Sequence, residues 1–321
     1  SSAHAHTPAE NGFDRFRLDS NLTRAIAAAR FTTPRPIQAE TIPACLEGRD
    51  VMGLAQTGTG KTAAFALPIL QRLIEEPGPG PLALIVAPTR ELAMQIDAEI
   101  RSLARNTKIK TLTVFGGVSI GNQIRALRHR PEIVVGCPGR LLDLKEQGHV
   151  RLGQMSHLVL DEGDLMLDMG FLRDVRKIIA ALPTKRQTML FSATMPTDVS
   201  CLAGEILSDP VRVEVSPRII TVEKVDQRVF FVDMGKKRAL LSHLLRDAGM
   251  SRVIVFTRTK RGASRLAIQL EKAGFPTESI HGDKAQSARQ SALARFRKGG
   301  ARVLVATDVA ARGIDISGVT H

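Results

Sequence analysis

The sequence has no tryptophan and no tyrosine, and only three of its 321 residues are cysteines. Cys45, Cys137 and Cys201 have neither the spacing of zinc ligands nor that of a redox pair, which argues against a zinc knuckle and a disulfide framework. A reduced, cytoplasmic compartment fits this cysteine usage. Because tryptophan and tyrosine are absent, any stacking on nucleobases must come from the 12 phenylalanines or from arginine side chains.

Long hydrophobic runs are missing as well. The longest, such as residues 82–87, have the length of a β-strand rather than of a membrane-spanning helix. Residues 1–12 lack the apolar core of a secretion signal, so we interpret them as a disordered leader or an expression remnant. His4 and His6 fall in this leader, where a polar tail explains them more simply than a metal site does. We therefore expect no membrane association.

Acidic residues are outnumbered by basic ones. The chain has 45 Lys and Arg against 32 Asp and Glu, a net charge of +13. Residues 225–321 hold 18 basic and 8 acidic residues, a net charge of +10, which leaves +3 for residues 1–224. This balance favours a polyanionic partner that contacts mainly the last third of the chain.

Short β-branched segments alternate with amphipathic segments over the first two thirds of the chain. The expected strands are 50–54, 83–87, 111–115, 133–136, 158–161 and 188–191, and expected helices include 89–104, 138–147 and 171–181. This alternation predicts an α/β fold with a mostly parallel sheet flanked by helices, in which ligands bind at the carboxyl ends of the strands.

The alternation is interrupted once and then restarts. Residues 209–224 contain two prolines and no helical period, which is typical of an extended connector. Beyond it we expect strands at 228–232, 253–257, 278–281 and 303–306 and helices at 236–248, 260–273 and 286–298. The predicted organisation is a first domain over 13–209, a linker over 210–224 and a second domain over 225–321.

The octapeptide from Ala55 to Thr62 (AQTGTGKT) follows a predicted strand and opens a predicted helix, as a phosphate-binding loop must. Its backbone N–H groups would surround phosphate oxygens, Lys61 would reach the β- and γ-phosphates, and the Thr62 hydroxyl would bind Mg²⁺. Because the first position is alanine rather than glycine, a plain glycine-rich turn stays open for this segment alone. The candidate nucleotide contacts are Gln56, Thr57, Gly58, Thr59, Gly60, Lys61 and Thr62.

A second motif supplies the acidic partner of this loop. Asp161 and Glu162 end an apolar strand, where a second Mg²⁺-facing group belongs. Asp161 would hold the metal ion and Glu162 would orient and polarise the attacking water, with catalysis coming mostly from positioning and charge neutralisation. Capping of the next helix accounts for Asp164 but not for the acidic pair.

With both motifs in place, the chain resembles the DEAD-box RNA helicases, and a bacterial RhlE-type member more than a eukaryotic one. These are ATP-dependent enzymes with two RecA-like domains, and the resemblance extends from Phe13 onward. Residues 31–38 (FTTPRPIQ) resemble the adenine-reading Q motif. The resemblance implies that Gln38 contacts adenine, with Phe13 and Phe31 as further nucleotide contacts.

Other family motifs follow in the family's order. Ser192 and Thr194 resemble the motif that couples hydrolysis to domain movement, and Gly313 and Asp315 the motif that meets the nucleotide ribose. Single segments have simpler explanations, such as a helix start or a strand-end turn. The resemblance implies RNA contacts at Pro88, Thr89, Arg90, Gly116, Gly117, Pro138, Gly139, Arg140, Thr257, Arg258, Gly282, Gln286, Arg289, Thr307 and Asp308.

The sequence also departs from the family pattern. Gly163 stands where the family has alanine, Arg30 where the Q motif usually has glycine, and Cys137 where a threonine usually precedes Pro-Gly-Arg. The family's arginine-finger segment, His-Arg-x-Gly-Arg-x-x-Arg, does not occur before His321, which leaves the second domain C-terminally incomplete. The sequence is then either a fragment, which we favour, or a protein that binds ATP and RNA but hydrolyses poorly.

The predicted function is RNA-stimulated ATP hydrolysis with Mg²⁺, coupled to domain closure and local RNA unwinding. We expect RNA binding to be largely sequence-tolerant, because contacts to phosphate and 2′-OH carry little sequence information. Partners in ribosome assembly or RNA decay follow from the resemblance. Two alternatives stay open: an ATP-gated RNA clamp or RNP remodelling factor with weak hydrolysis, and a P-loop ATPase or DNA translocase unrelated to RNA.

Overall fold

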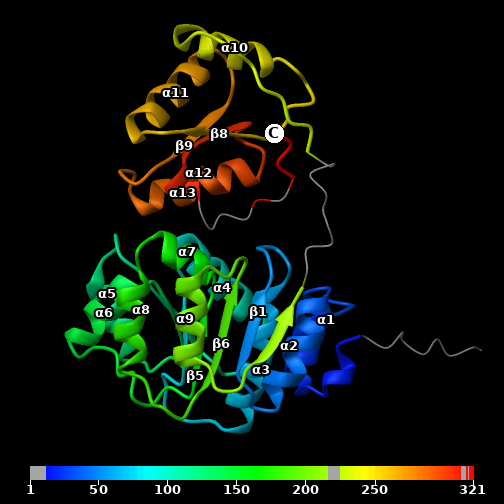
Figure 1. The fold of residues 1–321 in the computed structure, drawn as a ribbon, viewed down its shortest axis with the longest axis vertical. Coiled ribbons are helices and arrows are strands. Elements are labelled where there is room, and N and C mark those ends of the chain that lie inside the picture. The colour runs from blue at the N-terminus through cyan, green and yellow to red at the C-terminus, as the bar shows by residue number, and fades with distance from the viewer. Residues whose placement is uncertain (1–11, 216–224, 312–315, 317) are drawn as a thin grey trace, which may run out of the picture. The chain divides into compact units, whose positions relative to one another are not determined.

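The computed structural model describes residues 12–215, 225–311, 316 and 318–321 (Figure 1). Contacts divide the chain into two compact units, residues 1–219 and 220–321. His4, His6 and nearly all of the expected leader lie outside the described residues, as do 216–224 of the expected linker. No helix in the described part of the chain is long and apolar enough to cross a membrane.

The first unit is built on a seven-stranded sheet in the order β3-β4-β2-β5-β6-β1-β7, in which every neighbouring pair is parallel. Its strands are β1 (Val51–Leu54), β2 (Ala83–Val86), β3 (Thr111–Val114), β4 (Ile133–Gly136), β5 (His157–Leu160), β6 (Gln187–Ser192) and β7 (Val211–Glu214). Its helices are η1 (Asp14–Phe16), α1 (Ser20–Ala28), α2 (Pro36–Leu46), α3 (Lys61–Glu75), α4 (Arg90–Leu103), α5 (Ile120–Leu127), α6 (Pro138–Glu146), α7 (Gly163–Asp168), α8 (Leu172–Ile179) and α9 (Thr197–Ile206).

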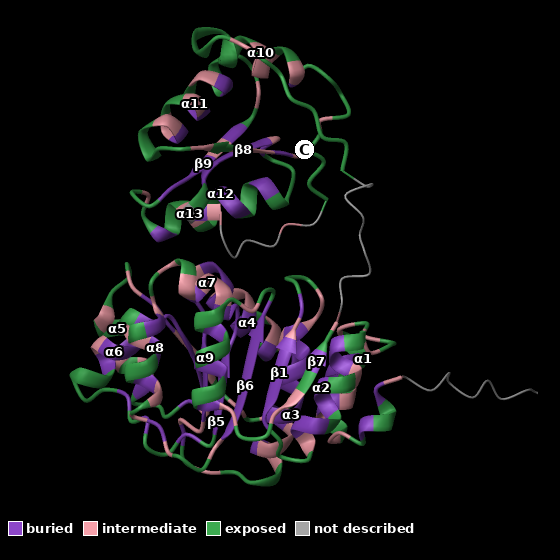
Figure 2. Ribbon diagram, viewed as in Figure 1, coloured by how far each residue is buried: buried purple, intermediate pink, exposed green. Residues whose placement is uncertain are grey.

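The central strands of this sheet are buried on both faces (Figure 2). Successive side chains along a strand point to opposite faces, so alternate residues enter two separate cores. One core joins Ile85, Val159 and Phe191 to apolar residues of α1 to α4, and the other joins Leu84, Leu158 and Leu190 to residues of α6 to α9. This confirms the prediction of a parallel sheet flanked by helices on both faces.

The second unit has a three-stranded parallel sheet in the order β8-β10-β9. Its elements are η3 (Met234–Lys236), α10 (Lys237–Leu244), β8 (Val253–Thr257), α11 (Lys260–Lys272), β9 (Thr277–Ile280), α12 (Gln286–Arg297), β10 (Val303–Thr307) and α13 (Asp308–Ala311). Core clusters lie on both faces of this sheet, with Phe296 in one and Leu270 in the other. The strand–helix alternation expected here is therefore present from β8 onward.

Two expected elements differ from the structure. The strand predicted at 228–232 is wrong: these residues form no strand, and Phe231 is 98 % exposed. No described strand lies beside the segment to share backbone hydrogen bonds with it. Residues 211–214, expected to belong to the connector, instead form β7 and pair with β1.

Candidate functional site

The phosphate loop lies between β1 and α3, at the carboxyl end of the sheet. Gly58 and Gly60 have φ angles of 81° and 91°, in the left-handed region that favours glycine. A Cβ at position 60 would lie 2.6 Å from Gln38 Nε2, so a side chain there would also collide with α2. The loop conformation therefore depends on glycine at the positions that the motif supplies.

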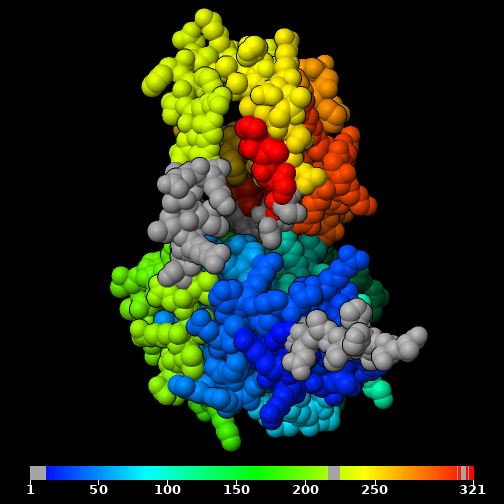
Figure 3. All heavy atoms as spheres, turned by 90° about the vertical axis from the view of Figure 1, so that its right-hand side faces the viewer, coloured from blue at the N-terminus to red at the C-terminus, as the bar shows by residue number. Residues whose placement is uncertain are grey.

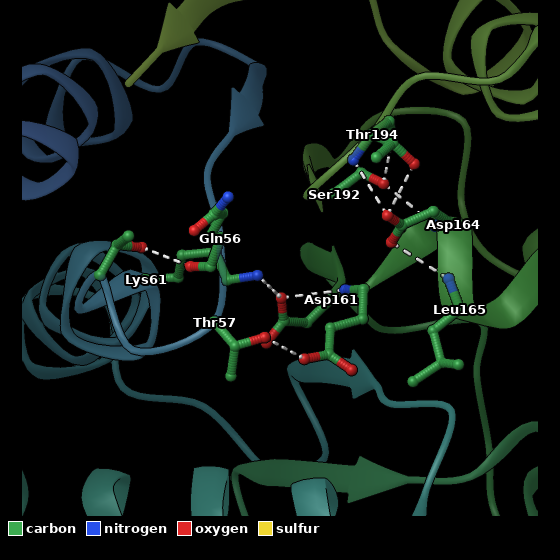
Figure 4. Close-up of polar contacts among 10 residues, drawn as sticks. Gln56, Thr57, Lys61, Asp161, Asp164, Leu165, Ser192 and Thr194 are labelled. Carbon is green, nitrogen blue, oxygen red and sulfur yellow. Dashed lines mark hydrogen bonds and ion pairs between the residues drawn. The ribbon is translucent and has the colours of Figure 1, made fainter. Parts of the chain in front are cut away.

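Lys61 is the first residue of α3 and is only 5 % exposed. Its Nζ atom lies 3.3 Å from Asp161 Oδ1 (Figure 4). The ammonium group nevertheless has no hydrogen bond of good geometry in the described part of the chain. A buried ammonium with unused donors fits an anionic ligand at the mouth of the loop.

Asp161 and Glu162 follow β5 directly and are 2 % and 6 % exposed. Glu162 has a φ of 58°, uncommon for a residue with a side chain, and its backbone N–H donates to Asp161 Oδ1 at 3.0 Å. The Thr57 hydroxyl donates to Glu162 Oε1 at 3.0 Å. Burial raises the pKa of the Glu162 carboxyl, and the Asp161 charge raises it further. The turn thus presents a basic carboxylate directly beside the phosphate loop.

Asp164 joins this motif to the end of β6. Its Oδ2 accepts hydrogen bonds from Thr194 N at 2.9 Å and Thr194 Oγ1 at 2.8 Å, and its N–H donates to Ser192 Oγ at 3.0 Å (Figure 4). Burial alone would raise the pKa of Asp164, but the hydrogen bonds from Thr194 and Ser192 hold it below its ordinary value. Sequence reasoning treated Asp164 only as a helix cap. The Asp-Glu-x-Asp spacing was the available signal.

Gln38, on α2, is 3 % exposed, and both the oxygen and the nitrogen of its side-chain amide are hydrogen-bonded. Its Oε1 accepts from Arg35 N at 2.8 Å and its Nε2 donates to Gly60 O at 3.1 Å. The Arg35 guanidinium also donates to the Gly58 carbonyl. The Q-motif residues are therefore fixed to the phosphate loop through two side chains.

The expected aromatic contacts lie near one another at the start of the first unit. The Phe13 and Phe31 rings stack with centroids 6.1 Å apart, and Phe13 is only 2 % exposed. Figure 3 shows the face of this unit to which α1 and α2 contribute. A hollow of about 690 Å³ adjoins these aromatics and is lined by Gly12, Asp14, Arg15, Thr33, Pro34, Pro36 and Ala39.

The expected RNA contacts of the first unit gather at the carboxyl ends of β2, β3 and β4. Thr89 caps α4 by accepting a hydrogen bond from Leu92 N at 3.2 Å. A Cβ on Gly117, whose φ is 78°, would lie 2.2 Å from Arg90 Nη1, so glycine lets that arginine lie against the loop. Arg140 donates to Val118 O at 3.4 Å. Three separate motifs thus meet at one edge of the sheet.

The second unit shows a similar gathering of expected RNA contacts. Thr257 and Thr307 are register partners at the ends of β8 and β10, and Arg289 donates to Ala310 O at 3.3 Å. Gly282 lies close to Lys260, which pairs with Asp283 at 2.6 Å. Arg258 and Asp308 are exposed. Gly313 and Asp315 lie outside the described residues.

The predicted Mg²⁺ ligands are Thr62 and Asp161. The described residues contain no group of three or more His, Cys, Asp and Glu side chains arranged for a metal ion. Burial raises the pKa of Glu99 on α4, while hydrogen bonds from the Thr62 side chain and the Ala63 backbone act in the opposite direction. Sequence reasoning missed this carboxyl, because nothing in the motif spacing connects α4 to the start of α3.

Comparisons with known proteins agree with this arrangement. Residues 35–202 match the family model described as DEAD/DEAH box helicase, and 236–321 match the helicase conserved C-terminal domain. DEAD-box ATP-dependent RNA helicase CshA of Bacillus subtilis is 45 % identical over 309 residues, which are 96 % of this chain and 62 % of the relative. CshA of Geobacillus kaustophilus is 44 % identical, over 96 % of this chain and 66 % of the relative. The chain thus spans under two thirds of the length of these relatives.

Solved structures of DEAD-box proteins are similar to this chain as well. A DEAD box protein from Methanococcus jannaschii has a TM-score of 0.61 and 38 % identity, over 95 % of this chain and 82 % of that one. S. cerevisiae Dbp5 bound to RNA and ADP BeF3 has a TM-score of 0.84 and 31 % identity, over 97 % of this chain and 79 % of that one. The second comparison supports the two-domain α/β fold across both units.

Proposed function

The chain belongs to the DEAD-box helicase family, and from this premise we propose that it is an ATP-dependent RNA helicase whose ATP hydrolysis is stimulated by RNA. The observation that carries the proposal is the buried Lys61 facing Asp161 and Glu162 at the mouth of the phosphate loop. The proposed cycle couples hydrolysis to closure of the two units and local unwinding of RNA.

On the nucleotide side, the loop amides and Lys61 bind the phosphates, and Thr62 and Asp161 would hold Mg²⁺, which supplies charge neutralisation. The residues present fit a phosphate group here, since the Lys61 Nζ atom is buried without a well-aligned acceptor. Glu162 orients the attacking water and takes its proton, a role supported by its raised pKa.

The adenine end of ATP is assigned to the Q motif. Gln38, held between Arg35 and Gly60, reads the base, with Phe13 and Phe31 beside it. The roles of Gly313 and Asp315 toward the ribose rest on the family resemblance alone.

Coupling between hydrolysis and RNA binding is assigned to Asp164, Ser192 and Thr194. Their hydrogen bonds connect Asp164, two residues after Glu162, to the end of β6 and the loop that follows it. A change at the carboxylate pair can therefore alter the loop that follows β6. This connection supports reciprocal coupling, in which ATP tightens RNA binding and RNA favours the hydrolytic arrangement.

RNA is the proposed partner at the carboxyl ends of the strands in both units. The gathered threonines, glycines and arginines suit phosphate and 2′-OH groups rather than base edges, so binding is largely sequence-tolerant. A cytoplasmic location and a role in ribosome assembly or RNA decay belong to the same proposal. The relatives' names, which specify ATP-dependent helicases, favour this function over an ATP-gated clamp.

The decisive experiment measures phosphate release with and without single-stranded RNA. RNA should stimulate the unmodified chain, and Lys61→Ala should abolish the stimulated rate. Lys145→Ala, which removes an exposed lysine at the end of α6, should behave like the unmodified chain. ATP-dependent retention of RNA without stimulated hydrolysis would instead favour the clamp. Equal stimulation by single-stranded DNA would favour a translocase unrelated to RNA.

A further inference from the structure

A hollow of about 400 Å³ opens in the first unit, at the edge of the sheet opposite the phosphate loop. Its loops immediately precede β2, β4 and β5, and these strands are parallel, so the hollow lies at their amino ends. The phosphate loop and the proposed RNA contacts lie at the carboxyl ends. The hollow is lined by Pro79, Gly80, Pro81, Ile124, Leu127, Arg128, Arg130, Gly148, His149, Val150, Arg151 and Gln154.

The walls of this hollow are held together by backbone contacts. A Cβ on Gly80 would lie 2.3 Å from Pro131 O, so the loops before β2 and β4 are in direct contact. Leu82 N donates to Glu132 O at 2.8 Å, and Ser156 N donates to Leu82 O at 2.8 Å. The buried side chains of Leu127 and Val150 connect the floor to the core. The hollow is therefore a preformed feature of the fold.

The rim is strongly basic. Arg128, Arg130 and Arg151 surround the hollow together with His149, and no aspartate or glutamate lines it. Within the described part of the chain, the side chains of these three arginines make no ion pair or hydrogen bond. Because residues 1–224 carry a net charge of only +3, this is a local concentration of cations. All three arginines are exposed, so an incoming anion can reach their guanidinium groups from solvent.

We propose that this hollow binds a small molecule that carries two or more phosphate groups and is the size of a nucleotide. Guanidinium groups match phosphate oxygens in pairs, and three of them balance the charge of a diphosphate. The apolar side chains of Pro81, Ile124 and Leu127 can contact a planar base. The volume falls within the range of small-molecule sites. An RNA strand fits less well, since no phenylalanine lines the hollow and the His149 imidazole alone cannot stack several successive bases.

The test is a calorimetric titration of the whole chain with GDP and, separately, with inorganic tripolyphosphate. Both titrations are repeated with Lys61→Ala, which removes the lysine of the phosphate loop, so that binding there is separated from binding in the hollow. We expect both probes to bind the unmodified chain. The double variant Arg130→Ala/Arg151→Ala should lose about tenfold or more in affinity for each arginine removed. Both side chains are exposed, so the variant should fold normally. Arg125→Ala removes an exposed arginine of α5 outside the hollow and should bind normally.

Four results would overturn the proposal. The unmodified chain could fail to bind either probe, or Arg125→Ala could weaken binding as much as the double variant does, which would indicate diffuse charge. Binding could be lost in Lys61→Ala and kept in the double variant, which would assign it to the phosphate loop. The double variant could lose affinity for single-stranded RNA while keeping GDP, which would make the rim an RNA surface. Because the readout is ligand binding, failure here leaves RNA-stimulated hydrolysis separately testable.

Discussion

Gly163 is the residue at which this chain departs from the family pattern inside the Asp-Glu-x-Asp motif. It is the first residue of α7, and its φ lies outside the left-handed region, so an L-residue fits the backbone. An added Cβ would lie 3.2 Å from Leu190 Cδ1 and 3.4 Å from Val199 Cγ1. These contacts are tight but involve side-chain ends. Glycine therefore leaves backbone freedom beside Glu162 and Asp164, with little spare room for a side chain.

We expect Gly163→Ala to raise RNA-stimulated turnover or to increase its ratio to the basal rate, because a methyl group there restricts the turn. The change in unfolding free energy should be within about 1 kcal/mol, since helix propensity and close packing oppose each other. Gly204→Ala is the matched control: it adds a methyl group in α9 with no atom within 4 Å. Unchanged RNA-stimulated hydrolysis in Gly163→Ala would contradict the expectation.

Glu162→Gln should reduce the stimulated rate about 10²- to 10⁴-fold while leaving ATP binding intact, because it removes the proposed base and keeps its shape. Glu146→Gln, an exposed change at the end of α6, should have no effect. The raised pKa of Glu162 means that it takes up a proton above the ordinary glutamate range. Activity should therefore fall on acidification through that raised pKa. A variant with a normal rate would exclude Glu162 as the base.

The candidate site residues that the sequence predicts are those whose proposed roles depend on local spacing. Lys61 follows two glycines, and Asp161 and Glu162 end a strand, so both motifs carry their structural context with them. Asp164 and Glu99 instead contact residues that are distant in sequence, Thr194 and Thr62. Thr194 lies 30 positions after Asp164, and only the β5–β6 pairing brings the two together. Short-range patterns contain no information on such contacts.

At the scale of elements, β5 carries an acid-sensitive position at its first residue. His157 is 6 % exposed, and its Nδ1 lies 2.9 Å from Ser156 Oγ. Burial lowers the pKa of His157 to about 4, with a smaller effect from the Arg72 charge. In the unfolded chain the His157 imidazole takes up a proton near pH 6.5. In the folded chain it stays neutral until the pH falls to about 4. Stability should therefore be lost as the pH falls through that window.

His157→Gln should reduce this acid sensitivity, since glutamine does not titrate. The contribution of His157 is at most about 1.4 kcal/mol for each pH unit between the two pKa values. Denaturant midpoints of the first unit at pH 7 and pH 5 measure it, with His129→Gln as an exposed control. A variant that loses as much stability on acidification as the parent would show that other groups dominate.

The sequence predicted strands correctly where the strand is covered by helices of the same unit. The alternation of apolar residues located β2, β5 and β6 because these strands lie between two helical layers. Residues 228–232 are also a short apolar segment, but Phe230 and Phe231 are exposed and no strand forms there. β7 shows the reverse case: prolines nearby suggested a connector, yet pairing with β1 makes 211–214 a strand. A strand depends on its neighbours as well as on its own residues.

At the scale of the whole molecule, charge is distributed unevenly between the two units. Residues 225–321 carry a net charge of +10. Four of the proposed RNA contacts are arginines, two in each unit: Arg90, Arg140, Arg258 and Arg289. If binding is mainly to phosphate, the salt dependence of RNA affinity should reflect this small set of contacts and not the whole net charge.

Each phosphate neutralised on a single strand contributes about −0.7 to the slope of log affinity against log salt concentration, so four contacts predict a slope of about −3. Arg258→Ala should make the slope shallower by about 0.7. Arg246→Ala, which removes an exposed arginine of the same unit outside the proposed contacts, should leave it unchanged. Fluorescence anisotropy with labelled single-stranded RNA across a salt series measures both. If the two variants change the slope equally, overall charge rather than the motif arginines governs binding.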